Sequence, residues 1–297
     1  SGAQNVLKYE QVRVWFRGRG DGWASGDLSA FFKIGSDDQN WYMYLVPASS
    51  TLWIPEAQID IPVWRQLRAD IEQRWLQGLP PSGAAACGIG DPAAYVACDG
   101  PYVVQVADPG VNPPNLAAAQ EMSAGIYRVA NTELLTNVEL WVDDIRLDAP
   151  LTQTGASMAM DARLAAADVA DFSVNYVRQD GLFQQIGRDP TYRTTGALVL
   201  GTNLRVDRFL PASLGIAVPF SVNHTFTSAD PILIGGTDIL AADIDNLRRP
   251  STNLTQYNFA VRRTVRGTSA LQRGLLDPMA FSGSIANGES QTELSSG

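Results

Sequence analysis

The segment Leu214–Phe226 alternates, almost without interruption, between apolar side chains and small or polar ones. Successive side chains of a β-strand point to opposite faces, so the pattern predicts a strand with one apolar and one polar face. At 13 residues, the segment exceeds the roughly 5–6 residues of a usual strand and would suffice for a tilted membrane strand of about 9–11. Pro219 cannot donate a backbone hydrogen bond, so we expect a bulge or loosened pairing there.

The same alternation recurs from residue 150 to residue 297 and is absent from the first half of the chain. Such strands form either a soluble antiparallel sheet on a core or a transmembrane β-barrel with one face in lipid and one on a polar lumen. Strand length and the small polar side chains favour the barrel. Five or six such strands cannot close one, since the smallest single-chain type has about eight. The segments that show the pattern are Met158–Leu164, Asp171–Tyr176, Ala197–Asp207, Leu214–Phe226 and Gln256–Arg262.

The sequence pattern of residues 1–149 predicts a jelly-roll-like β-sandwich with one helix. Trp64, Leu67, Ile71 and Trp75 recur at helical spacing after Asp60, a candidate N-cap. Many short strands with one covering helix are typical of a sandwich of about 150 residues. The predicted strands are Val12–Arg17, Leu28–Ile34, Trp41–Val46, Tyr102–Val106 and Val138–Leu147.

The last of these strands changes phase between Val142 and Ile145. A bulge at Asp143–Asp144 would return Ile145 and Leu147 to the inward face. These two carboxylates could also bind calcium or a glycan, but a bulged strand that ends the sandwich is the interpretation we favour.

Cys87 and Cys98 are the two cysteines of the chain, and they lie in a Gly-, Pro- and Ala-rich segment with ten residues between them. This spacing predicts a disulfide that ties a loop in an oxidising compartment. Two unpaired thiols are the alternative. Without a nearby histidine, the pair makes a poor zinc site.

Charge and residue types argue against several functions. The net charge of −9 repels nucleic acid, and no apolar run approaches the length of a transmembrane helix. His224 is the only histidine and lies on the apolar side of a predicted strand, which argues against a catalytic Ser-His-Asp or Cys-His system. Glu56 and Glu139 could be proposed as a glycosidase pair, but nothing in the sequence brings them together. We therefore predict no enzymatic activity, no cofactor and no metal site.

Several local sequences occur in the order found in the SprA (Sov) family, the outer-membrane translocon of type IX secretion and gliding motility. The similarity extends over roughly Val12–Arg263, while the cysteine-containing insertion and Asp143–Asp144 depart from the family pattern. Members are several times longer, and both ends of this sequence interrupt strand-like patterns, so we expect a fragment. The segments that resemble the family are Phe31–Ser36, Asn40–Tyr44, Leu52–Ile61, Glu139–Leu147 (with Trp141, Asp143, Asp144 and Arg146), Asp168–Asn175 and Leu214–Pro231.

The resemblance implies a large single-chain barrel in the outer membrane of a Gram-negative bacterium. Its lumen would pass folded cargo proteins, with a plug protein and a PorV-like lateral partner as gates. Residues 150–297 would then supply part of the barrel, and residues 1–149 a soluble domain inserted between strands. The resemblance implies lipid-facing positions at Leu198, Leu200, Leu214, Ile216, Val218, Phe220 and Val222. It implies lumen-facing positions at Asn203, Arg205, Gly215, Ala217, Ser221 and Asn223.

The alternative is a secreted carbohydrate-binding β-sandwich followed by a second sandwich, or a structural surface protein. The second-sandwich alternative predicts that residues 155–287 form a two-layer core. The translocon interpretation predicts one continuous, uncovered apolar sheet face in the same residues.

Overall fold

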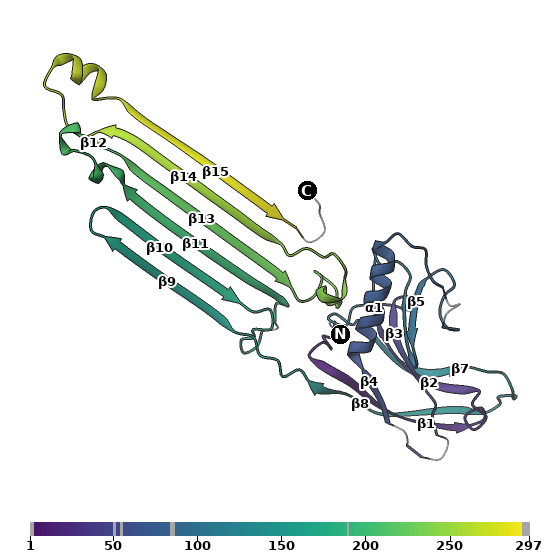
Figure 1. Ribbon diagram of the computed structural model, residues 1–297. Coiled ribbons are helices and arrows are strands. Elements are labelled where there is room, and N and C mark those ends of the chain that lie inside the picture. Colours follow the sequence, from purple (N-terminus) through teal and green to yellow (C-terminus); the bar gives the residue numbers. More distant parts are fainter. Residues whose placement is uncertain (1–2, 50–51, 54–55, 84–86, 189, 293–297) are drawn as a thin grey trace. The chain divides into compact units, whose positions relative to one another are not determined.

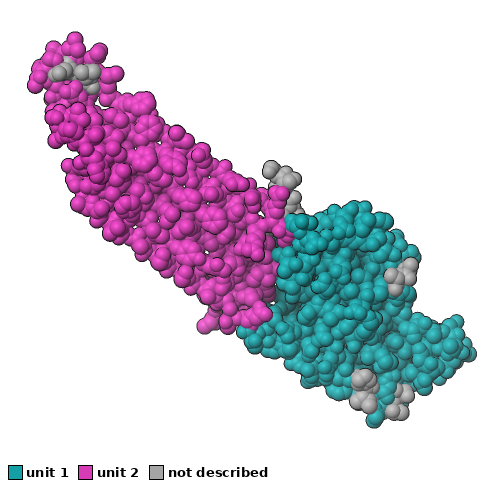
Figure 2. Space-filling model, in the orientation of Figure 1, with its two compact units in different colours: residues 1–152, 233–246 teal, residues 153–232, 247–297 magenta. Residues whose placement is uncertain are grey.

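The computed structural model of the chain describes residues 3–49, 52–53, 56–83, 87–188 and 190–292. The all-β class predicted from the sequence is confirmed: these residues form three antiparallel sheets and one α-helix. The chain divides into two compact units, coloured separately in Figure 2. Unit 1 comprises Ser1–Thr152 and Leu233–Asn246, and unit 2 comprises Gln153–Ile232 and Leu247–Gly297.

Unit 1 contains two sheets and the helix (Figure 1). One sheet has the order β4-β1-β8, from Glu56–Asp60, Tyr9–Gly20 and Val138–Pro150. The other has the order β5-β6-β3-β2-β7, from Tyr95–Asp99, Tyr102–Val106, Trp41–Val46, Leu28–Gly35 and Glu121–Arg128. The sequence predicted five of these strands and missed β4, β5 and β7, in which five-residue length or interior Gly and Ser obscures the alternation.

Helix α1 (Ile61–Leu76) supplies the centre of the unit 1 core. Its N-cap is Asp60, as predicted, but the carboxylate accepts a hydrogen bond from Gln11 Nε2 at 2.8 Å and does not cap a helix N–H. Trp64 is fully buried, and its Nε1 donates to the Met43 carbonyl at 3.1 Å. Because an indole N–H is costly to bury unpaired, this bond fixes the ring against the sheet.

The connection between two strands of unit 2 returns to unit 1. Leu233, Ile239 and Ile244 of this segment are buried among unit 1 residues. Asp238 is also fully buried, and its Oδ2 accepts hydrogen bonds from Tyr42 Oη at 2.6 Å and from the Leu116 N–H at 2.7 Å. The sequence pattern predicts one division of the chain, after residue 149, and gives no sign of this return.

Strand β8 carries the predicted bulge. Its register with β1 shifts between Arg13 and Trp15, opposite Asp144, which has a left-handed φ of 50°. The bulge returns Leu147 to the inward face, because Leu147 is the cross-strand partner of the buried Val12. Leu147 is nevertheless 36% exposed, and Ile145 is 54% exposed. The physical reason is that β8 is an edge strand with one neighbour, so less of the sandwich covers it.

Two loops of unit 1 are held by local contacts. Cys87 and Cys98 form the predicted disulfide, and both pack against a small core that includes Trp41, Met43 and Val103. The polar turn between β2 and β3 closes a hairpin, in which Asp37 Oδ1 accepts the Gln39 N–H at 2.9 Å and the Asn40 N–H at 2.8 Å.

Unit 2 is one antiparallel sheet of seven strands, in which the six long ones run side by side in sequence order (Figure 1). Strands β9 and β15 are the two edges, and the short β12 pairs with β14 beyond the start of β13. The strands are β9 (Ser157–Ala166), β10 (Ala170–Gln179), β11 (Arg193–Arg205), β12 (Ile216–Ala217), β13 (Pro219–Pro231), β14 (Ser251–Arg263) and β15 (Ala280–Gln291).

The predicted strand Leu214–Phe226 is broken at its beginning. Leu214 lies in a 3₁₀ turn and Gly215 ends that turn with a left-handed φ of 55°, so neither is a strand residue. Val218 separates β12 from β13, and Pro219 is the first residue of β13. A strand start is one of the few places in a sheet where the missing N–H of proline is tolerated. The expected loosened pairing is therefore present as an interruption of the strand.

Unit 2 has almost no core. Among the buried hydrophobic residues that the structure describes, only Ala170 belongs to unit 2, whereas unit 1 contains all the others. Within the described ranges, no helix is long and apolar enough to cross a membrane.

Candidate functional site

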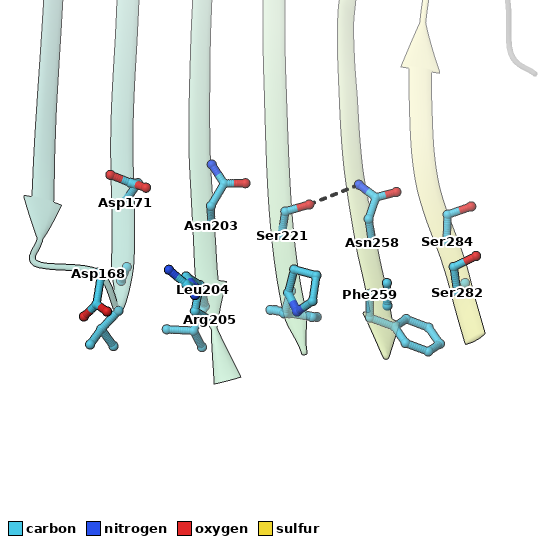
Figure 3. A pocket seen from close by; sticks show the side chains of 16 residues that line it. Asp168, Asp171, Asn203, Leu204, Arg205, Ser221, Asn258, Phe259, Ser282 and Ser284 are labelled. Atoms are coloured by element: carbon cyan, nitrogen blue, oxygen red, sulfur yellow. Dashed lines mark hydrogen bonds between the residues drawn. The ribbon is translucent and has the colours of Figure 1, made fainter. Parts of the chain in front are cut away.

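Five polar side chains form one row across five neighbouring strands of unit 2 (Figure 3). Each is the direct cross-strand partner of the next, so all five point to the same face of the sheet. With strands about 4.8 Å apart, the row is roughly 19 Å long. Its members are Asp171, Asn203, Ser221, Asn258 and Ser284.

The row lines a hollow of about 710 Å³ at one end of the sheet. Asn258 Nδ2 donates to Ser221 Oγ at 3.3 Å, as drawn in Figure 3, and this bond orients two neighbours in the row. Asp168, at the same end, is paired with Arg208. Most side chains that line the hollow are therefore neutral, and their polar groups can form hydrogen bonds with water.

The polar character continues along the same face. The next row contains Ser173, Asn223 and Gln256, with Gly201 between the first two. A Cβ at Gly201 would lie 2.5 Å from Ser173 Oγ, so glycine leaves room for that hydroxyl. Val177, Val199 and Leu254 are the half-exposed apolar exceptions on this face.

The opposite face of the same sheet is apolar and uncovered. Cross-strand partners such as Phe172 and Leu164, or Val222 and Tyr257, place the large side chains of all six long strands on this face. Ten of its large apolar residues are each more than a third exposed: Met158, Met160, Leu164, Phe172, Leu200, Phe226, Tyr257, Val261, Phe281 and Ile285.

The register places most of the candidate residues on these two faces. Leu198, Leu200, Phe220 and Val222 lie on the apolar face, and Ile216 joins them through its pairing with Arg263. Leu214, Gly215 and Val218 lie outside the strands. The residues on the polar face are Asn203, Arg205, Ala217, Ser221 and Asn223.

The residues considered for catalysis are not assembled into a site. His224 lies on the apolar face, with Nδ1 2.9 Å from Thr255 Oγ1. Glu56 and Glu139 flank β1 at positions opposite Trp15 and Arg19, which separates their Cα atoms by roughly 17 Å. Among the described residues, no three His, Cys, Asp or Glu side chains cluster to hold a metal ion.

The two carboxylates of the family-like motif, Asp143 and Asp144, have partners within the protein. Asp144 pairs with Arg146 at 2.9 Å, and Arg146 also pairs with Glu56 at 3.1 Å. Asp143 accepts the Asp144 N–H at 2.9 Å, within the bulge. Trp141 is the cross-strand partner of Arg17 and Arg146 that of Arg13, so Trp141 and Arg146 lie on the same outer face of the sheet.

The polar row was partly recognisable from the sequence, because Asn203 and Ser221 stand at polar positions of alternating strands. Asn258 and Ser284 were not singled out, since only the register brings them beside Ser221. The chain matches no protein-family model and no curated protein sequence. The arrangement offers a hydrated, mostly neutral surface on one side of a sheet and an apolar surface on the other.

Proposed function

We propose that unit 2 is part of a large outer-membrane β-barrel that conducts proteins, with its apolar face in lipid and its polar face on the lumen. The observation that carries this proposal is the seven-stranded sheet, which has two opposite faces and, among its described residues, a single buried hydrophobic residue. A soluble sheet buries its apolar face against a second layer. Unit 1 of the same chain does so, and unit 2 does not.

Strand geometry supports the same function. The six long strands have 10–13 residues and connect each to the next in sequence order, as in up-and-down barrels. Within the described residues, one side of β9 and one side of β15 have no strand partner. Further strands would pair with these edges and close the barrel, because unpaired backbone groups cannot remain in hydrocarbon.

The polar row supports passage of large cargo. Its side chains are short, mostly neutral and close to the sheet, so they hold water and give a moving protein few strong contacts. Unit 1 is then a soluble domain borne by the barrel. The resemblance to the SprA (Sov) family supplies the cargo class, the plug and the lateral partner of this proposal.

The alternative of two sandwiches predicts a second layer over the apolar face of residues 155–287. The single-layer sheet favours the barrel over this alternative.

The test compares two substitutions in the same strand. Leu200 and Val199 are each 37% exposed, but their side chains lie on opposite faces of β11. In the complete barrel, Leu200→Arg should weaken insertion into liposomes, since an arginine facing lipid near the midplane costs about 2–4 kcal/mol. Val199→Arg should insert nearly as well as the unchanged chain, because its charge would face water.

Flotation of the complete barrel with liposomes measures the inserted fraction. Equal insertion of both variants, or a stable monomeric full chain in buffer without detergent, would contradict the assignment of the two faces.

A further inference from the structure

The outer face of the sheet β4-β1-β8 in unit 1 carries an exposed cluster of arginine and tryptophan. Arg17 and Arg19 alternate with buried residues on β1, and their cross-strand partners on β8 are Trp141 and Glu139. The guanidinium carbons of Arg17 and Arg19 lie 5.7 and 4.9 Å from the centre of the Trp141 ring. Such stacking holds a guanidinium flat against the ring and leaves its N–H groups at the edge for a ligand.

A second indole extends this surface. The ring of Trp53 lies 6.3 Å from that of Trp141, centre to centre, at an angle of 45°. Trp141 is 42% exposed, which is unusual for a tryptophan in a sandwich with a closed core. Its Nε1 donates to Glu139 Oε2 at 3.3 Å, so the indole is held in place.

The two arginines have few acidic partners. Within the described residues, Arg17 makes no ion pair, and its buried Nε has no hydrogen-bond acceptor. Arg19 has one carboxylate contact, to Glu139 at 3.9 Å, with both side chains about half exposed. By contrast, Arg13 and Arg146 on the same sheet face are paired with carboxylates at 2.7–3.4 Å. Among the described arginines of this face, Arg17 and Arg19 therefore have the weakest pairing with carboxylates.

We propose that Arg17, Arg19, Trp53 and Trp141 bind an acidic saccharide. A guanidinium fork matches a carboxylate, and an indole face matches the apolar face of a sugar ring. Glu139 is placed to accept a sugar hydroxyl beside Arg19. A simple anion would contact the arginines but not the indole rings, and a neutral sugar would contact the indole rings but not pair with the arginines. A uronic acid unit uses both.

The experiment measures binding of trigalacturonate to the full chain in detergent by titration calorimetry. The methyl ester of trigalacturonate has the same rings without charge, and its affinity should be lower by a factor of about ten or more. Arg19→Gln and Arg17→Gln should each weaken trigalacturonate binding by about the same factor. Trp141→Ala should weaken both ligands, and Trp141→Phe should recover part of the loss.

Arg146→Gln is the matched control. It removes a charge from the same face, but the donors of Arg146 are already paired with carboxylates. It should change the affinity less than about twofold. Near-ultraviolet circular dichroism establishes that each variant is folded. Absence of trigalacturonate binding, equal affinity for the methyl ester, or an equal loss in Arg146→Gln would each overturn the proposal.

Discussion

Asp238 allows a sharp test of how the returning segment is held in unit 1. Both of its hydrogen bonds, from Tyr42 and from the Leu116 N–H, end on Oδ2, while Oδ1 has no hydrogen-bond partner among the described residues. Burial raises the pKa of this carboxyl, and this effect outweighs the opposing effects of the hydrogen bonds and of Arg68. Folding therefore favours the protonated form of this carboxyl relative to the unfolded chain.

Asp238→Asn retains one oxygen that can accept both hydrogen bonds, and its amide group replaces the unpartnered oxygen. We expect it to change the free energy of unfolding by less than about 1 kcal/mol at pH 7. Asp238→Ala should cost about 1–3 kcal/mol, because the buried Leu116 N–H loses its acceptor. Tyr42 is less affected, since its hydroxyl can donate to the Pro114 carbonyl at 3.1 Å.

The pH dependence follows from the raised pKa. The stabilising contribution of Asp238 is complete below its unfolded pKa of about 3.9 and is lost as the pH rises through the higher folded pKa. The unchanged chain should therefore lose stability relative to Asp238→Asn as the pH rises above about 4.

Denaturant titration followed by tryptophan fluorescence is the assay. All seven tryptophans lie between Trp15 and Trp141, so the signal reports on unit 1 within the full chain. A cost of about 3–5 kcal/mol for Asp238→Asn at pH 7, with the unchanged chain gaining relative stability as the pH rises, would refute the reasoning. That result would mean an ionised carboxylate paired with Arg68.

Two further predictions concern the stability of unit 1. A chain of residues 1–152 should not fold alone, because burial of Leu233, Ile239 and Ile244 contributes about 5–9 kcal/mol, which is comparable with the stability of a whole domain. Adding the peptide 233–246 should restore its near-ultraviolet circular dichroism, and folding without the peptide would contradict this prediction. Replacing Cys87 and Cys98 by serine should lower the free energy of unfolding by about 2–3 kcal/mol, as expected for a loop of this length, and an unchanged denaturation midpoint would show that the disulfide does not constrain the unfolded chain.

Local sequence predicted much of the fold because many strands carry their own pattern. The bounds Trp41–Val46 and Tyr102–Val106 agree with the structure, and the helix was expected from Trp64, Leu67 and Ile71. Failures occurred where local pattern and tertiary context differ. Leu214 continues the alternation of β13, but Gly215 turns the chain, and Val218 donates its N–H to Asp207 Oδ1 at 3.0 Å.

The candidate sites were less predictable than the strands. Alternation identifies which residues of one strand share a face, but it does not determine which strand lies beside which. Asn258 and Ser284 belong to the polar row only through the register of β13, β14 and β15. Trp141 appeared in a family-like motif, but its contact with Arg17 and Arg19 depends on the shift in register at the β8 bulge.

The sequence by itself determined the all-β class, the two faces of the long strands, and the disulfide between Cys87 and Cys98. These properties depend on the two-residue period of a strand or on a short separation along the chain. Tertiary structure alone decided that Leu233–Asn246 completes unit 1, and that Asp238 is buried against Tyr42 and Leu116. Nearly two hundred residues separate Tyr42 from Asp238, and no local period encodes contacts over such a distance.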